Sequence, residues 1–236
     1  MNTTPSPIRI GVLGAGTVGA HVIHLLQQWS DEYERRLGTR LEVQSVLVRR
    51  LDAKRAFPID PSLLTTDPYE VIAGKDLVVE LIGGVDPAYD YVMTALKNGS
   101  AVITGNKALI ASRGPELFAA AREANTRLYF EAAVAGAIPV IGALTSSLRG
   151  DRVRQIAGVV NGTTNFILDQ MTTQGADYGE ALAQAQELGF AEADPSADVE
   201  GYDASAKCAI MSSLSFGRWV SVESVPRQGI TALSTD

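Results

Sequence analysis

The amino-acid sequence predicts an α/β protein, with a doubly wound parallel sheet followed by a second, α+β domain. Three observations support this fold class. An apolar run over 8–13 leads directly into a glycine-rich turn and then into a helical pattern. Further apolar runs alternate with helical patterns as far as 132, where the composition changes to mainly small apolar residues. The chain has 236 residues, which is enough for two small domains with cores of their own.

The composition excludes several classes of protein. Hydrophobic residues make up 46% of the chain and charged residues 20%, which is typical of a globular protein. The formal net charge of -7 argues against non-specific binding to nucleic acid or to an anionic membrane. No apolar run approaches the length of a membrane span. Residues 1–7 are polar and lack a signal-peptide pattern, so we expect a disordered lead-in and a cytoplasmic protein.

The turn after the first predicted strand carries a glycine fingerprint, GAGTVG, over 14–19. A strand, spaced glycines and a helix in immediate succession favour a dinucleotide-binding site. Gly14 allows the tight turn, Gly16 lets the backbone approach a pyrophosphate, and Gly19 lets the helix pack closely on the strand. The helix N-terminus faces the anion. The alternative is a glycine-rich turn without a ligand.

The second predicted strand, 41–48, bears on the choice of cofactor. Sites that prefer NAD usually place Asp or Glu at the end of this strand, on the ribose 2′-hydroxyl. Asp31 and Glu32 precede the strand, in the end of the first helix or in the loop after it, and are poorly placed for this role. Four basic residues follow it instead, namely Arg49, Arg50, Lys54 and Arg55. Arg49 is therefore a candidate contact for a 2′-phosphate, which favours NADP(H), and the alternative is a solvated basic loop.

Three further strands complete the predicted sheet, over 77–82, 101–104 and 127–132, with helical patterns at 88–97 and 114–124. Ligands of such sheets bind beyond the carboxyl ends of the strands. Lys107 falls at such an end, where it could reach a phosphate, a carboxylate or a carbonyl oxygen, or it could be a surface lysine. We expect a Rossmann-type NAD(P)-binding domain over 8–133 and a catalytic, substrate-binding domain over 134–236.

The second domain is predicted from four segments. Pro139 is expected in the first turn of a helix, and 153–160 is expected to be a strand. Helices are expected at about 164–174 and 178–188. The strand ends in a polar loop, 161–165, which suits either an anion site built from backbone amides or a tight turn.

An acidic stretch with a single lysine closes this part of the chain, over 187–207. After a turn at Asp194-Pro195, Gly201 opens an apolar-rich helix on which Asp203 and Lys207 are four residues apart. That spacing places both side chains on one helix face. Acids gathered around one cation suit a small ligand that has an ammonium group. The alternative is an ordinary exposed pair of opposite charges, worth a few tenths of a kcal/mol.

The chain closely resembles the homoserine dehydrogenases from Ile8 onwards. The resemblance rests on six motifs: GVLGAGTVG (11–19), VVELIGG (78–84), TGNKALIA (104–111), EAAVAGAIP (131–139), VNGTTN (160–165) and GFAEADPSADVEGYDASAK (189–207). The last motif is long, with many fixed spacings, and is the most specific of the six.

The resemblance implies an activity and residue roles. The family reduces L-aspartate 4-semialdehyde to L-homoserine with NAD(P)H, on the route to threonine, methionine and isoleucine. The catalytic lysine matches Lys207, with Asp203 as its orienting partner. The substrate-binding residues match Glu192, Asp203 and Lys107. As negative charge develops on the aldehyde oxygen, a lysine ammonium can stabilise it and supply a proton.

The resemblance also implies cofactors and partners. The turn at Gly14, Ala15, Gly16, Thr17, Val18 and Gly19 would hold the pyrophosphate, Lys107 would be a further cofactor contact, and Gly189 would touch the nicotinamide end. Arg49 is a candidate cofactor contact on a separate ground, namely its position after the second predicted strand. NADP(H) is the expected cofactor, with NAD(H) as a second one. A sodium ion would sit on a loop matching Glu131, Val134, Gly136 and Ile138, largely through main-chain oxygens. The family assembles as homodimers or higher homo-oligomers.

One departure from the family pattern leaves two alternatives open. The family's chain normally continues well past residue 236, so the second domain is expected to be truncated relative to it. The chain could therefore be a non-catalytic NADP(H)-binding protein. It could also be a related reductase that acts on another carbonyl compound resembling an amino acid.

Overall fold

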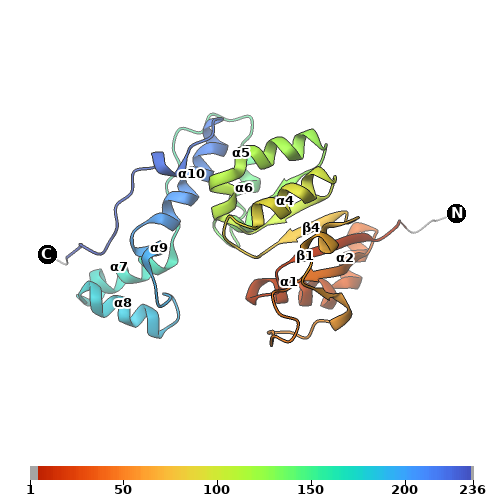
Figure 1. Cartoon of the computed structure of the whole chain (residues 1–236). Coiled ribbons are helices and arrows are strands. Elements are labelled where there is room, and N and C mark those ends of the chain that lie inside the picture. Colours follow the sequence, from red (N-terminus) through yellow and green to blue (C-terminus); the bar gives the residue numbers. More distant parts are fainter. Residues whose placement is uncertain (1–4, 235–236) are drawn as a thin grey trace. The chain divides into compact units, whose positions relative to one another are not determined.

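The computed structural model describes residues 5–234, and the chain divides into two compact units, 1–137 and 138–236 (Figure 1). The sequence places the boundary four residues earlier, between 133 and 134. Each unit is described by itself below.

The first unit is built on a six-stranded parallel sheet with the order β3-β2-β1-β4-β5-β6. The strands are β1 (Ile8–Leu13), β2 (Leu41–Leu47), β3 (Leu64–Thr65), β4 (Leu77–Glu80), β5 (Ala101–Thr104) and β6 (Leu128–Tyr129). The chain starts at the centre of the sheet, builds outwards to β3 and then crosses to β4. This order is that of a dinucleotide-binding sheet, and the predicted doubly wound fold is confirmed.

Helices pack on both faces of this sheet, so its central strands, β1 and β4, are largely buried. The helices are α1 (Thr17–Gln28), α2 (Ser30–Leu37), α3 (Pro68–Ile72), α4 (Ala88–Lys97) and α5 (Lys107–Glu123), with short 3₁₀ turns η1 (Pro61–Leu63) and η2 (Glu131–Ala133). Ile10 and Val12 of β1 pack with Ile23 of α1, whereas Leu13 packs on the other side with residues of α4 and α5. Burial on both faces explains why the strands appear in the sequence as continuous apolar runs.

Two helices of this unit differ from the prediction. Asp31 and Glu32 lie in the first turn of a separate helix, α2, and not in the end of the first helix or in a loop. Helix α5 begins at Lys107, well before the predicted start at 114, because the Asn106 side chain caps it by accepting from the Leu109 N–H at 3.1 Å. Pro115 lies inside this helix.

An ion pair at the edge of β1 gives a pH-dependent contribution to stability. Asp76 accepts hydrogen bonds from the Arg9 side chain at 2.9 Å and from its backbone N–H at 2.8 Å. These bonds lower the pKa of Asp76 from 3.8 to about 2. Both side chains are nearly half exposed, so screening by water limits the contribution to about 1 kcal/mol or less.

A lowered carboxyl pKa stabilises the fold above the unfolded value and ceases to do so as pH falls through the folded value. We therefore expect Asp76→Asn to lower the free energy of unfolding at pH 6. The difference from the parent chain should shrink as the pH falls from about 4 to about 2. Urea unfolding at several pH values measures this, and a difference that stays constant over that range would contradict it.

All regular secondary structure among the described residues of the second unit is helical. Its helical segments are α6 (Val140–Gly142), η3 (Ala143–Ser147), α7 (Gly162–Gln174), α8 (Tyr178–Glu187), α9 (Ser196–Val199), α10 (Tyr202–Phe216) and η4 (Val222–Ser224). Its core joins Ile167 and Met171 of α7 to Ala181 and Ala185 of α8 and to Val199 of α9. Helix α8 begins with a capping box formed by Asp177 and Glu180.

Two predictions for this unit were wrong. The segment 153–160 is mostly exposed and belongs to no helix or strand. A strand needs backbone partners, and the described residues of this unit contain no second strand to supply them. Pro139 is the residue before α6, not part of its first turn.

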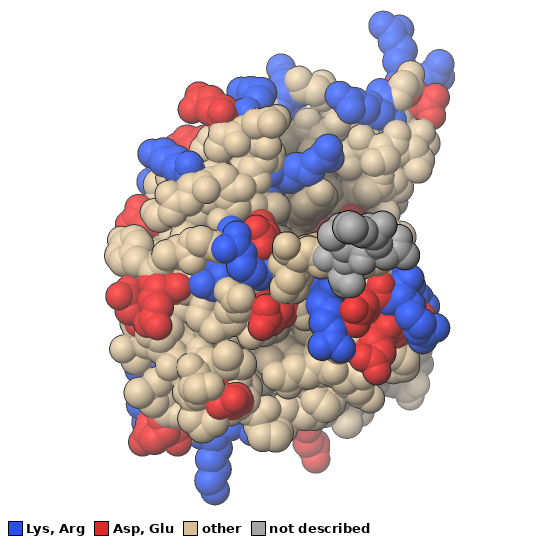
Figure 2. Space-filling view, turned by 90° about the vertical axis from the view of Figure 1, so that its right-hand side faces the viewer, with Lys and Arg blue, Asp and Glu red and all other residues tan. Residues whose placement is uncertain are grey.

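The surface carries charged side chains of both signs (Figure 2). Figure 2 shows acidic and basic side chains interspersed over the face in view. Some charged side chains of the described residues form ion pairs, such as Arg36 with Glu32 and Arg40 with Glu34. Among the described residues, no helix is both long enough and apolar enough to span a bilayer.

Candidate functional site

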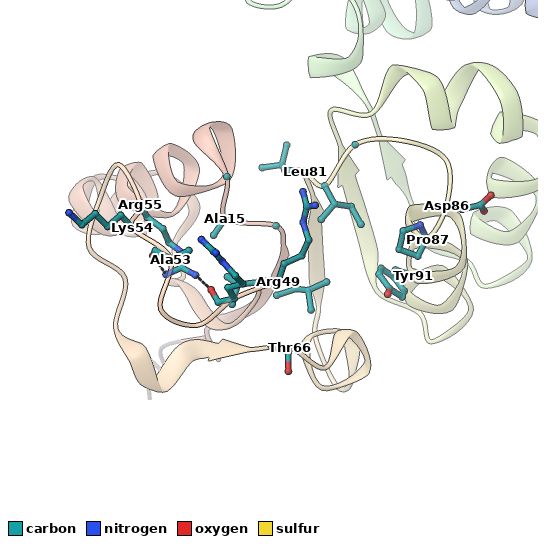
Figure 3. Close-up of a pocket in the computed structure, with 17 residues that line it drawn as sticks. Ala15, Arg49, Ala53, Lys54, Arg55, Thr66, Leu81, Asp86, Pro87 and Tyr91 are labelled. Carbon is teal, nitrogen blue, oxygen red and sulfur yellow. Dashed lines mark hydrogen bonds between the residues drawn. The ribbon is translucent and has the colours of Figure 1, made fainter.

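A pocket of about 700 Å³ lies at the carboxyl ends of the central strands of the first unit. It is lined by Gly14, Ala15, Gly16, Leu47, Val48, Arg49, Arg50, Ala53, Lys54, Arg55, Thr66, Leu81, Ile82, Gly83, Asp86, Pro87 and Tyr91. In Figure 3 the loop bearing Lys54 and Arg55 borders one side, and Pro87 and Tyr91 border the opposite side. This is the position at which a doubly wound sheet binds its ligand.

The three glycines of the turn differ in what surrounds them. Gly14 has a φ of +104°, which an L-side chain rarely adopts. A Cβ on Gly19 would lie 2.0 Å from the Gly14 carbonyl oxygen, so only glycine allows α1 to approach the turn this closely. A Cβ on Gly16 would meet nothing within 4 Å. The backbone at Gly16 is therefore open on the side where a ligand can approach, while Thr17 and Val18 begin helix α1.

The basic loop after β2 is held in shape by one of its own arginines. The Arg55 guanidinium donates to the carbonyl oxygens of Arg50 at 2.7 Å and Ala53 at 2.9 Å. It therefore closes the loop on itself, with Arg49 and Lys54 placed along the pocket wall (Figure 3). Cationic side chains at this wall can bind a phosphate group.

A fully buried carboxylate organises the opposite wall. Glu80, at the end of β4, accepts from the backbone N–H groups of Ile82 at 2.9 Å and Gly83 at 3.2 Å, and from the Thr104 hydroxyl. Asn106 donates to the Gly84 carbonyl oxygen at 2.5 Å. These bonds join the loop after β4 to the start of α5, where the partly buried Lys107 is the first residue.

The second unit contains a buried ion pair. Lys207 Nζ lies 2.6 Å from Asp203 Oδ2, and only 15% of the lysine side chain and 3% of the aspartate side chain are exposed. The same ammonium donates to the Val160 carbonyl oxygen at 2.6 Å. The alternative of an ordinary exposed pair is therefore wrong. Buried charges need partners of this kind, because desolvation penalises them heavily.

Two further residues belong to this cluster, and the sequence did not assign either of them a role. The Asn161 side-chain amide donates to Asp198 Oδ1 at 2.6 Å and to Asp203 Oδ2 at 3.0 Å. Asn161 also caps α7 by accepting from the Thr164 N–H at 2.8 Å. The sequence did offer a signal for the role of Asn161 as a cap. Asparagine is favoured at the N-cap position, and Asn161 stands just before a helical pattern.

The remaining candidate residues lie outside that cluster. Glu192 is exposed, and no hydrogen bond or ion pair in the described part of the chain joins its carboxylate to Lys207 or Asp203. Gly189 follows α8 with a φ of +77°. Of the proposed sodium ligands, Glu131, Val134 and Gly136 lie in the first unit, and Ile138 is the first residue of the second.

The strand order, the glycine turn and the pocket above it define a dinucleotide-binding protein of the Rossmann class. Two family models together match most of the chain. Residues 14–131 match the model described as homoserine dehydrogenase, NAD binding domain, and residues 139–236 match the model described as homoserine dehydrogenase. The chain belongs to the homoserine dehydrogenase family.

Individual relatives agree with this assignment. The chain is 48% identical over 231 residues to the homoserine dehydrogenase of Corynebacterium glutamicum, covering 97% of this chain and 52% of that protein. A homoserine dehydrogenase structure from Thiobacillus denitrificans matches with a TM-score of 0.92 and 43% identity, covering 99% of this chain and 55% of the other. A hyperthermophilic archaeal homoserine dehydrogenase in complex with NADPH matches with a TM-score of 0.82 and 29% identity, covering 98% and 76%. The chain thus spans about half the length of the curated relatives it matches.

Proposed function

We propose that this chain catalyses the reversible, NAD(P)-dependent interconversion of L-aspartate 4-semialdehyde and L-homoserine, a step towards threonine, methionine and isoleucine. Family membership supports this proposal. The observation that carries it is the buried pair of Lys207 and Asp203. An ammonium held in place by a carboxylate can stabilise the negative charge that develops on a carbonyl oxygen during reduction, and can donate a proton to it. NAD(P)H supplies the hydride when it is bound.

Lys207 acts as the proton donor and as the electrophile. Its ammonium has three N–H donors, and within the described residues two of them face Asp203 and the Val160 carbonyl oxygen. The third is available to the aldehyde oxygen, on which negative charge develops during reduction. Asp203 orients the ammonium and balances its charge, so that the lysine is prepared for the transition state before substrate binds.

Two other candidates bind the ends of the substrate. Glu192 has an exposed carboxylate that suits the α-ammonium group, and Lys107 has an ammonium that suits the α-carboxylate. Gly189 would contact the nicotinamide end of the cofactor, where the absence of a side chain allows close approach.

NADP(H) is the preferred cofactor in this proposal, with NAD(H) as the second. Arg49 and Lys54 line the pocket at the end of β2, where the ribose 2′-position of a bound dinucleotide falls. The NADPH complex of an archaeal relative gives further support.

Replacing Arg49 with serine is expected to weaken NADPH binding by about 10- to 100-fold, because a charge-assisted hydrogen bond to the 2′-phosphate is lost. NADH binding should change less than about threefold, since NADH has no such phosphate. Fluorescence titration with both nucleotides measures the two effects. Arg122→Ser, at an exposed position in the last turn of α5, removes the same charge and serves as the control. Equal losses for both nucleotides would contradict the assignment.

A sodium ion on the loop after β6 is part of the proposal. The main-chain oxygens of Glu131, Val134, Gly136 and Ile138 are hard donors of the kind that such cations prefer. The backbone turns sharply here, with Ala135 and Gly136 at φ values of 63° and 57°. The left-handed conformation of a residue other than glycine costs energy, and a bound ion would offset it. The assay below, repeated with choline in place of sodium, tests the requirement.

The proposed enzyme is a cytoplasmic homodimer or higher homo-oligomer. Support comes from the family resemblance and, for the compartment, from the single cysteine, Cys208, which allows no intrachain disulfide. Sedimentation velocity of the 236-residue chain measures the oligomeric state, and a monomer at all concentrations would contradict this part.

The decisive experiment is a coupled assay of this chain with L-homoserine and NADP⁺, repeated with NAD⁺. Reduction of NADP⁺ that depends on homoserine would support the proposal. Turnover of other hydroxy or oxo acids instead would favour the related reductase. NADPH binding without any turnover would favour a non-catalytic NADP(H)-binding protein.

A further inference from the structure

The segment immediately before α7 holds both members of the buried ion pair. The Val160 carbonyl oxygen accepts from Lys207 Nζ at 2.6 Å, and the next residue, Asn161, donates to Asp203 Oδ2 at 3.0 Å. Asp203 and Lys207 also contact each other at 2.6 Å. These three contacts, together with the peptide bond between Val160 and Asn161, close a ring through residues 160, 161, 203 and 207. A ring of this kind restricts the lysine more than the ion pair alone would.

The amide of Asn161 can face the acids in only one orientation. Its Oδ1 accepts from the Thr164 N–H at 2.8 Å, as the cap of α7, and lies 3.0 Å from the Thr164 hydroxyl oxygen. The amide nitrogen, with two N–H donors and no acceptor, is therefore directed at the carboxylates. Because the side chain is 9% exposed, water competes little for these bonds.

Each of the two amide donors is used by a different acid. One bonds to Asp198 Oδ1 at 2.6 Å and the other to Asp203 Oδ2 at 3.0 Å. The two carboxylates thus approach the same nitrogen, and without a donor between them they would repel each other. The neutral amide therefore holds both acids in fixed positions, and one of them, Asp203, is paired with Lys207.

We propose that Asn161 is a positioning residue that fixes Asp203, and through it Lys207, in the orientation needed for proton donation. This inference rests on the function proposed above. Asn161 touches neither the reacting atoms nor the cofactor in this assignment, and it acts only through Asp203 and the neighbouring Val160. Misplacement of a catalytic group by about 1 Å can cost about 100-fold in rate.

The test uses Asn161→Asp and Asn161→Ser in the 236-residue chain. Aspartate and serine are as good as asparagine at a helix N-cap, so α7 should keep its stability. Both changes remove the amide donors, and only the aspartate adds a charge. We expect kcat for homoserine oxidation to fall by about 10- to 100-fold in both variants, and NADPH affinity to stay within about twofold.

A matched control separates positioning from a general effect of charge. Gln174→Glu makes the same amide-to-carboxylate change at the exposed last residue of α7, about 18 Å along the helix from its start. We expect its kcat to stay within about twofold of the parent chain. Values of kcat within threefold of the parent in both Asn161 variants would overturn the inference. Variants that fail to fold would overturn it as well, because the cap is kept in each.

A second readout does not depend on turnover. In ¹⁵N-lysine NMR spectra, a buried ammonium with two fixed acceptors should give an observable, slowly exchanging Nζ–H signal, which Lys207→Ala assigns. We expect this signal in the parent chain and in Gln174→Glu, and its loss or broadening in both Asn161 variants. If the parent chain shows no turnover, the proposed function fails, and the NMR comparison still decides the role of Asn161. An unchanged Lys207 signal in the variants would contradict it.

Discussion

Replacing Lys207 with alanine is expected to lower kcat for homoserine oxidation by about 10³-fold or more. The lysine is proposed to supply both a proton and electrostatic stabilisation, and each of these effects is worth about 10²-fold or more. NADPH affinity should stay within about twofold, because the residues that line the candidate dinucleotide pocket all belong to the first unit and do not include Lys207. Steady-state kinetics and nucleotide titration measure the two quantities separately.

The Lys207→Ala variant will also be less stable, and this must be measured alongside activity. Removal of the ammonium leaves the carboxylate of Asp203 buried without its counter-charge, which typically costs about 3–5 kcal/mol. Kinetics should therefore be compared at a temperature where urea titration shows the variant to be folded. Lys97→Ala, at the exposed end of α4, removes a lysine outside both candidate sites and serves as the control. Near-normal turnover by a folded Lys207→Ala protein would reject the proposed role.

Alanine substitutions at Gly16 and Gly19 are expected to have different effects, although both glycines belong to the same turn. At Gly19 the new Cβ would lie 2.0 Å from the Gly14 carbonyl oxygen, and backbone atoms must move to relieve the overlap. Overpacking of this kind costs about 1–3 kcal/mol, and we expect a loss of at least 2 kcal/mol in the free energy of unfolding. NADPH binding should weaken as well, because the turn is displaced.

At Gly16 the new Cβ meets no protein atom within 4 Å, and the φ of -72° suits alanine. The loss of stability should not exceed about 1 kcal/mol, the cost of a poorer N-cap. NADPH affinity should nevertheless fall by at least 10-fold, because the Cβ occupies the space through which a pyrophosphate approaches the backbone. Thermal or urea unfolding and nucleotide titration of both variants measure the contrast. Normal NADPH affinity in Gly16→Ala would show that the dinucleotide does not bind over this turn.

The parts of the structure that were predicted correctly depend on local patterns. Five of the six strands were predicted from apolar runs, whereas β3, which is two residues long, was not predicted. The glycine turn is defined by residues within a few positions of one another. The pairing of Asp203 with Lys207 was also predictable, because a spacing of four residues places them on one helix face. The burial of this pair was not predictable from the spacing, because an exposed pair has the same spacing of four residues.

The features that were missed depend on contacts between distant residues. Asn161 bonds to acids 37 and 42 positions away, and no local spacing indicates either contact. The segment 153–160 has the composition of a strand, but a strand also needs a partner, and composition does not show whether one is present. The start of α5 was also missed, although its signal is local: the Asn106 side chain caps the helix, and Pro115, typical of a helix start, lies inside it.

The self-closure of the loop after β2 limits how cofactor preference can be redesigned. The Arg55 guanidinium binds main-chain carbonyl oxygens of its neighbours and so maintains the conformation of the loop. Neutralising every cation in the loop would therefore disrupt the pocket wall instead of changing the cofactor preference. A switch towards NADH should therefore begin at Arg49 and leave Arg55 unchanged.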